Sequence, residues 1–157
     1  MSVRIEHRIG INAPAHVIWS FIYDLSTWAH WNPIYPKAEG TIRIGSRLDL
    51  TLALPGEAHR QIHPVVLEWV PDAQLHWRLG LLGGLVSNVR YLEIDSLGPE
   101  NCIFSNGELF GGLLGPLVVR QAGRGIRRGF AAMGEALKAA AEDAWRNDGQ
   151  GPTSEKA

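Results

Sequence analysis

Arg90, Asn106 and Glu108 are the residues whose types and spacing could carry chemistry. They lie in two stretches, residues 87–96 and 102–110, which we expect to pair as a β-hairpin across the turn between them. A hairpin symmetric about that turn places Arg90 opposite Glu108, with Asn106 on the same face. This predicts a cross-strand ion pair at an apolar cavity, where it could orient a carboxyl, hydroxyl or keto group of a ligand. In the alternative interpretation the register is shifted by one residue and these side chains face water, or the pair only satisfies itself.

The same register places apolar residues beside these polar ones. Leu92 lies opposite Asn106 and Ile94 lies opposite Phe104, which indicates that this face of the hairpin is buried. The three polar residues are the candidates for any catalytic acid–base step, because no serine or cysteine has a recognisable base beside it. We predict no metal site and no cofactor, since the six histidines show no ligand spacing.

Composition argues against several classes of protein. The chain has 157 residues and a formal net charge of -1, so it lacks the positive charge that attracts nucleic acid. Its one cysteine, Cys102, cannot form an internal disulfide and is interpreted as a small buried apolar residue. No apolar stretch reaches the ~20 residues that a transmembrane helix needs, and the first residues lack a signal-peptide core. We therefore expect a cytoplasmic protein without a transmembrane segment.

Alternation and helical spacing predict the elements that must position these residues. Residues 3–11 alternate as a half-buried strand does, and a helix with Asn12 as its N-cap follows and ends near Asp24. Turn residues separate further strand-like stretches: 38–44, 47–54, 59–70, 74–80, 87–96 and 102–110. From Pro116 to about Trp145 apolar residues recur at helical spacing, namely Val118, Ala122, Ile126, Phe130, Met133, Leu137 and Ala141.

This order predicts an α+β helix-grip fold, in which a curved antiparallel sheet of about six or seven strands wraps around a long C-terminal helix. A short helical segment follows the first strand. We expect a single domain over residues 1–146 and a disordered tail over 147–157, which is polar and rich in Gly, Ser and Pro. A helix laid on a curved sheet leaves space beneath it, and that space is the predicted ligand cavity. The residues expected to contact the ligand are His7, Trp28, Trp31, Leu50, Leu52, Trp77, Arg90, Leu92, Phe104, Asn106, Glu108, Phe110, Ile126, Phe130 and Met133.

Two Gly/Leu-rich loops and a stripe of arginines in the C-terminal helix are further features of the sequence. The loops, residues 80–85 and 110–116, suit a cavity mouth that opens and closes, or they pack under the helix or on a partner chain. Such a basic stripe is usually a solvated face of a helix. In the alternative interpretation it contacts an anionic membrane surface or an acidic carrier domain. It consists of Arg120, Arg124, Arg127 and Arg128.

Four stretches resemble a known family. They are Ile9-Gly-Ile-Asn-Ala-Pro-Ala-His-Val-Ile-Trp19, Asp24 with Trp31-Asn32-Pro33, Asn106-Gly-Glu-Leu-Phe-Gly111, and Arg128-Gly-Phe-Ala-Ala-Met-Gly-Glu-Ala-Leu-Lys138. In this order they resemble the START-like helix-grip superfamily (SRPBCC), within it the polyketide cyclase/dehydrase-like group, over residues 3 to about 145. The chain departs from this pattern at Arg90 and Asn106, where many relatives carry histidine. The resemblance implies the fold but not one activity, because the superfamily includes cyclases, lipid carriers, hormone receptors and chaperone-associated domains.

The leading interpretation is binding of a small hydrophobic molecule, whether a lipid, an acyl group or an aromatic, polyketide-like compound. The first alternative is a cyclase or dehydratase that folds a polyketide-like or aromatic substrate in a shaped cavity. The second is a protein–protein interaction module that docks through its apolar loops. We expect no nucleic-acid partner, and a homodimer is left open.

Overall fold

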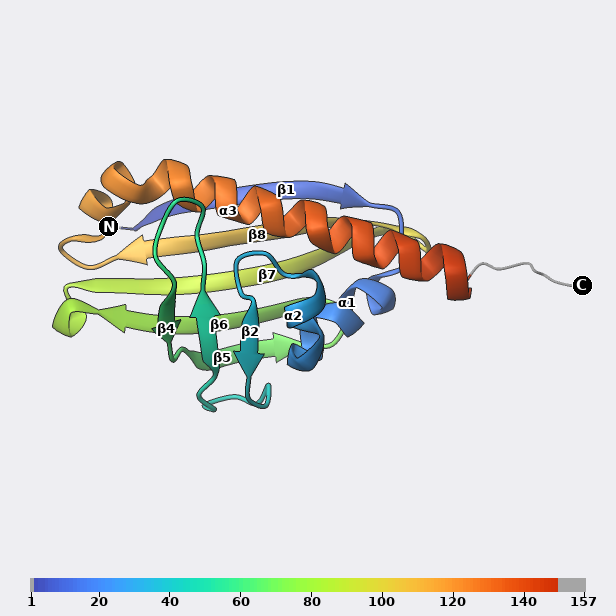
Figure 1. Ribbon diagram of the computed structural model, residues 1–157, viewed down its shortest axis with the longest axis horizontal. Helices are drawn as coiled ribbons and strands as arrows, with labels where there is room; N and C mark the ends of the chain where they lie inside the picture. The colour runs from blue at the N-terminus through green and yellow to red at the C-terminus, as the bar shows by residue number, and fades with distance from the viewer. Residues whose placement is uncertain (1, 150–157) are drawn as a thin grey trace, which may run out of the picture.

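A long antiparallel sheet with one long helix across it forms most of the structure, a computed structural model that describes residues 2–149 (Figure 1). The helix, α3 (Gly115–Ala144), packs on one face of the sheet along β1 and β8. The strand order is β1-β8-β7-β6-β5, and every neighbouring pair is antiparallel. The strands are β1 (Val3–Ile11), β5 (Val65–Val70), β6 (Gln74–Leu81), β7 (Val86–Gly98) and β8 (Asn101–Gly111).

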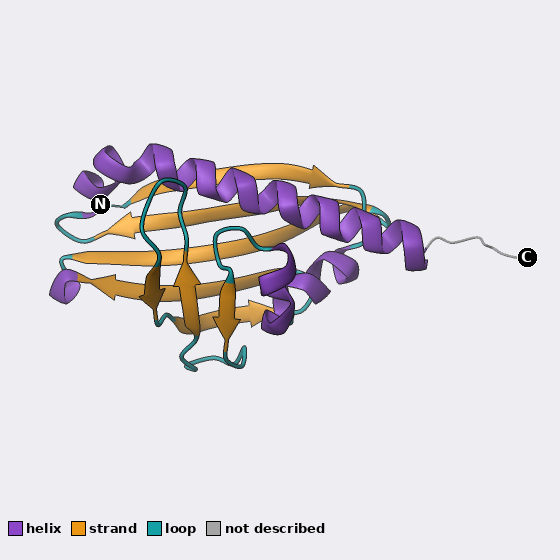
Figure 2. Cartoon of the chain, viewed as in Figure 1, coloured by secondary structure: helices purple, strands orange, loops and turns teal. Residues whose placement is uncertain are grey.

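Three short strands form a second sheet that crosses the long strands on the side of α3 (Figure 2). They are β2 (Lys37–Glu39), β3 (Asp49–Leu52) and β4 (Arg60–Ile62). The expected strand over residues 59–70 is therefore divided between the two sheets. The division falls at Pro64, which has no N–H to donate to a ladder. The helix-grip architecture is confirmed, with the strands shared between a main sheet of five and a smaller sheet of three.

Short helices connect these elements. The helix after β1 is present as α1 (Ala15–Tyr23), but the expected N-cap at Asn12 is wrong. Pro14 holds the cap position, and the Asn12 N–H instead donates to the Glu142 carboxylate on α3 (2.8 Å). The other short helices are η1 (Leu25–Thr27), α2 (Trp28–Trp31), η2 (Leu82–Gly84) and η3 (Trp145–Gly149). Of the expected tail, residues 147–149 continue this last turn, and residues 150–157 lie outside the described residues.

The register of the last hairpin agrees with the prediction. Arg90 pairs with Glu108, and Leu92 pairs with Asn106, on a face that packs toward the interior. Asn106 is fully buried, and its side-chain amide donates to the Phe130 carbonyl oxygen on α3 (3.0 Å). This bond fastens the sheet to the helix in a place where water is excluded.

Glycines allow α3 to approach its neighbours closely. A Cβ at Gly129 would lie 2.8 Å from a methyl group of Leu54, and one at Gly134 would lie 3.1 Å from the Nδ1 atom of His7. The glycines therefore serve close packing in the second half of the helix. No helix in residues 2–149 is both long and apolar enough to cross a membrane.

Candidate functional site

A cavity of about 400 Å³ lies between the main sheet, the small sheet and the first half of α3. Strands β6, β7 and β8 form its base, β3 and β4 form one side, and α3 covers it. Its walls are mostly apolar, as expected for a site that takes a small organic molecule. The lining residues are Tyr35, Leu52, Leu54, Glu57, Arg60, Ile62, Trp77, Leu79, Leu81, Leu82, Val86, Asn88, Glu108, Phe110, Val118, Ala122, Ile126 and Phe130.

The apolar stripe of α3 has two different functions along its length. The first part, which recurs every four residues from Val118 to Phe130, lines the cavity. The second part, Met133, Leu137 and Ala141, is fully buried in the packed core. The void is thus confined to the first half of the helix, where the small side chain of Ala122 leaves room above the sheet.

Glu108 and Asn88 form the polar part of the cavity base. Burial raises the pKa of Glu108 from 4.5 to about 7, although Arg90, the Asn88 amide and Arg60 each act to lower it. The Oδ1 atom of Asn88 is buried and has no hydrogen-bond partner among the described residues. Near neutral pH the Glu108 carboxyl can donate or accept a hydrogen bond, and Asn88 offers an acceptor. Together they could hold a ligand hydroxyl group.

The expected ion pair between Arg90 and Glu108 is not formed. The two residues are register partners, but no pair of their charged atoms lies within 4.0 Å. Arg90 instead donates through Nε to the Tyr35 hydroxyl (3.1 Å) and through one terminal nitrogen to the carbonyl oxygens of Tyr91 (3.1 Å) and Gly107 (3.0 Å). The second terminal nitrogen faces the Met133 sulfur (3.6 Å), so the guanidinium makes its hydrogen bonds without a carboxylate.

Arg90 lies behind aromatic residues that line the cavity. Its guanidinium carbon is 4.1 Å from the ring centre of Phe130 and 5.8 Å from those of Tyr35 and Trp77. Burial raises the pKa of the Tyr35 hydroxyl, so this group remains a neutral acceptor for Arg90. Trp28 closes the cluster with its ring 5.6 Å from Tyr35. The arginine fixes the cavity wall from behind rather than facing a ligand.

Six of the fifteen predicted ligand-contact residues line the cavity: Leu52, Trp77, Glu108, Phe110, Ile126 and Phe130. Seven are buried in the packed core and do not line it: Trp28, Leu50, Arg90, Leu92, Phe104, Asn106 and Met133. His7 is half-buried and lies against Gly134 of α3. Trp31 borders a different, open groove beside α3. Of the three catalytic candidates, the structure brings Glu108 alone to the cavity surface.

Twelve of the lining residues were not among the predicted ligand contacts, although the sequence pattern could have identified some of them. Leu79 and Leu81 continue the alternation of Trp77, and Val118 and Ala122 precede Ile126 at helical spacing. Asn88 precedes Arg90 by two residues and so shares its face. Tyr35, Leu54 and Glu57 lie in loops whose course the sequence pattern does not define. The other missed positions lie on β4, in η2 and at the start of β7: Arg60, Ile62, Leu82 and Val86.

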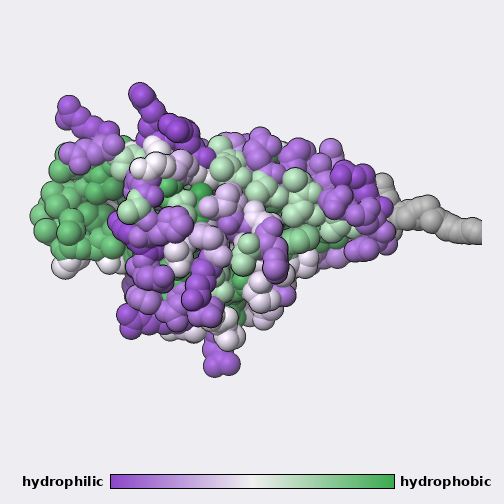
Figure 3. Space-filling model, in the orientation of Figure 1, coloured by the Kyte–Doolittle hydropathy of each residue, from purple (hydrophilic) through white to green (hydrophobic). Residues whose placement is uncertain are grey.

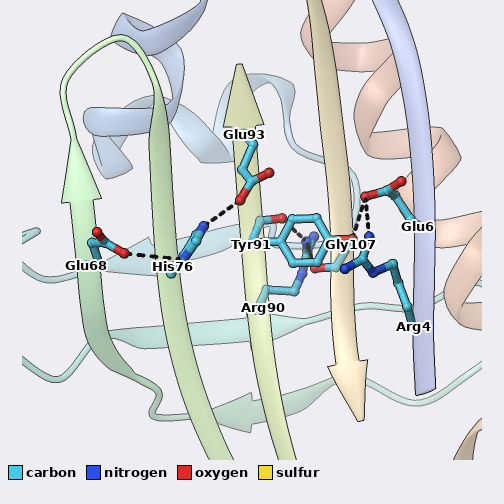
Figure 4. A network of polar contacts seen from close by, with 8 residues as sticks. All are labelled: Arg4, Glu6, Glu68, His76, Arg90, Tyr91, Glu93 and Gly107. Atoms are coloured by element: carbon cyan, nitrogen blue, oxygen red, sulfur yellow. Dashed lines mark hydrogen bonds and ion pairs between the residues drawn. The ribbon is translucent and has the colours of Figure 1, made fainter. Parts of the chain in front are cut away.

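The opposite face of the main sheet carries a separate polar network (Figure 4). His76 contacts Glu93 (2.8 Å) and Glu68 (3.8 Å), and the Tyr91 hydroxyl donates to Glu6. Burial and Glu6 raise the pKa of Tyr91. These side chains alternate with the inward residues of their strands, so they do not reach the cavity. No group of three metal-binding side chains occurs in the part of the chain that the structure describes.

Comparisons with solved structures find the same fold. The Zhui aromatase/cyclase from Streptomyces sp. R1128 is 17% identical and superposes with a TM-score of 0.76 over 95% of this chain and 99% of that one. A norcoclaurine synthase from Thalictrum flavum is 19% identical, with a TM-score of 0.71 over 93% and 98%. A START superfamily protein from Mycobacterium smegmatis is 20% identical, with a TM-score of 0.67 over 89% and 97%.

Sequence comparison gives the family. No protein of curated function matches the chain in sequence. The family model described as polyketide cyclase/dehydrase and lipid transport matches residues 2–142, which includes both sheets and nearly all of α3. The resemblance to the START-like superfamily is thereby confirmed. With a helix-grip fold, an apolar cavity under the helix and a family match over most of its length, this chain belongs to the polyketide cyclase/dehydrase and lipid transport family.

Proposed function

We propose that this protein binds a small amphipathic molecule in the cavity beneath α3, with an apolar body and one hydroxyl group. One observation carries the proposal: a mostly apolar cavity of about 400 Å³ contains a buried acceptor, Asn88 Oδ1, that has no partner within residues 2–149. A buried polar atom without a partner is costly, so a ligand hydroxyl that donates to it would add affinity. Glu108 would complete the contact by donating to the hydroxyl oxygen when protonated.

A test of binding is mass spectrometry of the purified protein under native conditions, followed by extraction of whatever molecule accompanies it. We expect an adduct with the wild-type protein and none with Ala122→Trp, whose indole would occupy the cavity. Ala132→Trp is the matched control, because Ala132 is exposed on the same helix. An adduct that survives in Ala122→Trp would place the bound molecule elsewhere and contradict the proposal.

A second candidate function is catalysis of a cyclisation or dehydration, which the environment of Glu108 favours. A carboxyl with a pKa near the ambient pH is suited to both giving and taking a proton. Two of the similar structures are described as an aromatase/cyclase and as a norcoclaurine synthase with a transition-state analogue. Turnover of a poly-β-keto thioester by the wild type and its loss in Glu108→Gln, with binding retained, would support this candidate.

The third interpretation, an interaction module, stays a prediction.

A further inference from the structure

One end of the molecule presents a cluster of exposed leucines. Figure 3 shows it as a continuous hydrophobic area over η2, the β8–α3 connection and the beginning of α3. Its members are Leu82, Leu85, Leu113 and Leu117, with exposed fractions of 65%, 44%, 85% and 46%, and we call them the leucine tip. A contiguous apolar surface of this kind on a soluble fold marks a site of interaction.

The two loops that carry the leucine tip are fastened to each other. The Leu114 N–H donates to the Leu85 carbonyl oxygen (3.0 Å), and the Leu85 N–H donates to the Leu82 carbonyl oxygen (3.2 Å). Gly112 has a φ of 80° and lies so close to the Leu85 carbonyl that a Cβ would overlap it. The leucines are therefore held together by backbone contacts at one end of the sheet.

Positive charge adjoins the leucine tip along α3. Leu117, Arg120 and Arg124 follow one another at spacings of three and four residues, so they share one exposed face of the helix. Arg127 and Arg128 continue the exposed positive surface, and none of these arginines forms an ion pair with another described residue. No acidic residue occurs between Glu108 and Glu135. From another element, the Glu57 carboxylate approaches α3 beside Gly125.

We propose that the leucine tip and the adjoining arginines dock the protein on the surface of an anionic lipid bilayer. Leucines on protruding loops can enter the fluid acyl layer, while arginines at their border bind lipid phosphates. A protruding apolar tip would need a matching hollow on a protein partner, whereas a bilayer deforms around it. Leu82 and Val118 line the cavity at this same end, so the docked molecule would hold its cavity beside the lipid. The docking does not depend on the proposed ligand.

The test is co-sedimentation of the full chain with vesicles of phosphatidylcholine alone and with about one third phosphatidylglycerol. We expect binding to the anionic vesicles that weakens with added salt. Leu113→Ser/Leu117→Ser should weaken it by about a hundredfold, because each of the two leucines removed costs about a tenfold loss of affinity. Arg120→Gln/Arg124→Gln should weaken it by about fivefold per arginine and reduce the preference for anionic lipid.

Matched controls separate docking from general surface effects. Leu97 is as exposed as Leu82 but lies near the end of β7, outside the leucine tip, and Leu97→Ser should leave vesicle binding unchanged. Arg43→Gln/Arg47→Gln removes two exposed charges far along the chain from α3 and should also have no effect. Each variant's melting temperature shows that it is folded. The proposal is overturned if the wild type binds neither kind of vesicle, or if Leu97→Ser weakens binding as much as Leu113→Ser/Leu117→Ser does. It is also overturned if Leu113→Ser/Leu117→Ser abolishes self-association and leaves vesicle binding unchanged.

Discussion

Arg90 and Glu108 are partners across β7 and β8, yet the arginine donates to Tyr35 and to two backbone carbonyls and not to the glutamate. The guanidinium is therefore satisfied inside the core, and the carboxyl is left at the cavity surface. We therefore expect separate roles: Arg90 would maintain the cavity wall, and Glu108 would be available to a ligand.

The raised pKa of Glu108 predicts a particular dependence of stability on pH. Between pH 4.5 and about 7 the folded chain keeps the Glu108 proton while the unfolded chain releases it. The unfolded state then binds fewer protons, so the contribution of Glu108 to the free energy of unfolding falls as pH rises through this window. At pH 8 we expect Glu108→Gln to be more stable than the wild type by about 1–3 kcal/mol, with little difference at pH 4.5.

Urea denaturation of both proteins at several pH values measures this difference. Glu135→Gln, which changes an exposed carboxylate on α3, is the matched control and should track the wild type. A constant difference between Glu108→Gln and the wild type from pH 4.5 to 8 would mean that Glu108 ionises in the folded protein as it does in the unfolded chain.

Arg90 is expected to matter for stability far more than its register partner. Arg90→Met retains apolar volume but removes the donors to Tyr35 and to the carbonyl oxygens of Tyr91 and Gly107. Buried acceptors without donors are costly, so we expect a loss of about 2–4 kcal/mol in the free energy of unfolding. The measurement is denaturation at pH 8 beside Glu108→Gln. Equal losses in the two variants would indicate a functional ion pair after all.

The ring of Tyr91, on the face of the main sheet opposite the cavity, is expected to require a glycine at position 107. A Cβ at Gly107 would overlap the Tyr91 ring and hydroxyl, which donates to Glu6 (Figure 4). Gly107→Ala should cost about 1–3 kcal/mol in the wild type and much less in a Tyr91→Ala background, a double-mutant cycle that isolates this contact. Gly10→Ala is the control, since a Cβ there meets nothing within 4 Å. Equal costs in both backgrounds would assign the effect to the backbone instead.

Local patterns predicted the parts of the fold that depend on nearest neighbours. The β7–β8 register follows from one short turn and strict alternation, which together fix Arg90 against Glu108. The length of α3 follows from apolar spacing without proline between Pro116 and its end. The division of residues 59–70 into β4 and β5 was missed, although Pro64, which cannot donate to a ladder, marks the place where it falls.

The contacts that decide the site come from distant parts of the chain. Tyr35, the acceptor for Arg90, lies 55 residues away in a loop, and no periodic pattern links the two. The boundary between cavity and core along α3 depends on how closely the sheet approaches each turn. Ala122 lines the void while Ala141 is fully buried, although both belong to one apolar stripe.

The most direct test of the central claim is a fluorescence titration with the neutral apolar probe N-phenyl-1-naphthylamine. We expect saturable binding by the wild type and by Ala132→Trp, which adds an indole to the exposed side of α3. Ala122→Trp should bind at least tenfold more weakly while it retains the wild-type melting temperature, because its indole fills the space beneath the helix. Unchanged probe affinity in a folded Ala122→Trp protein would contradict the claim that this cavity receives the ligand.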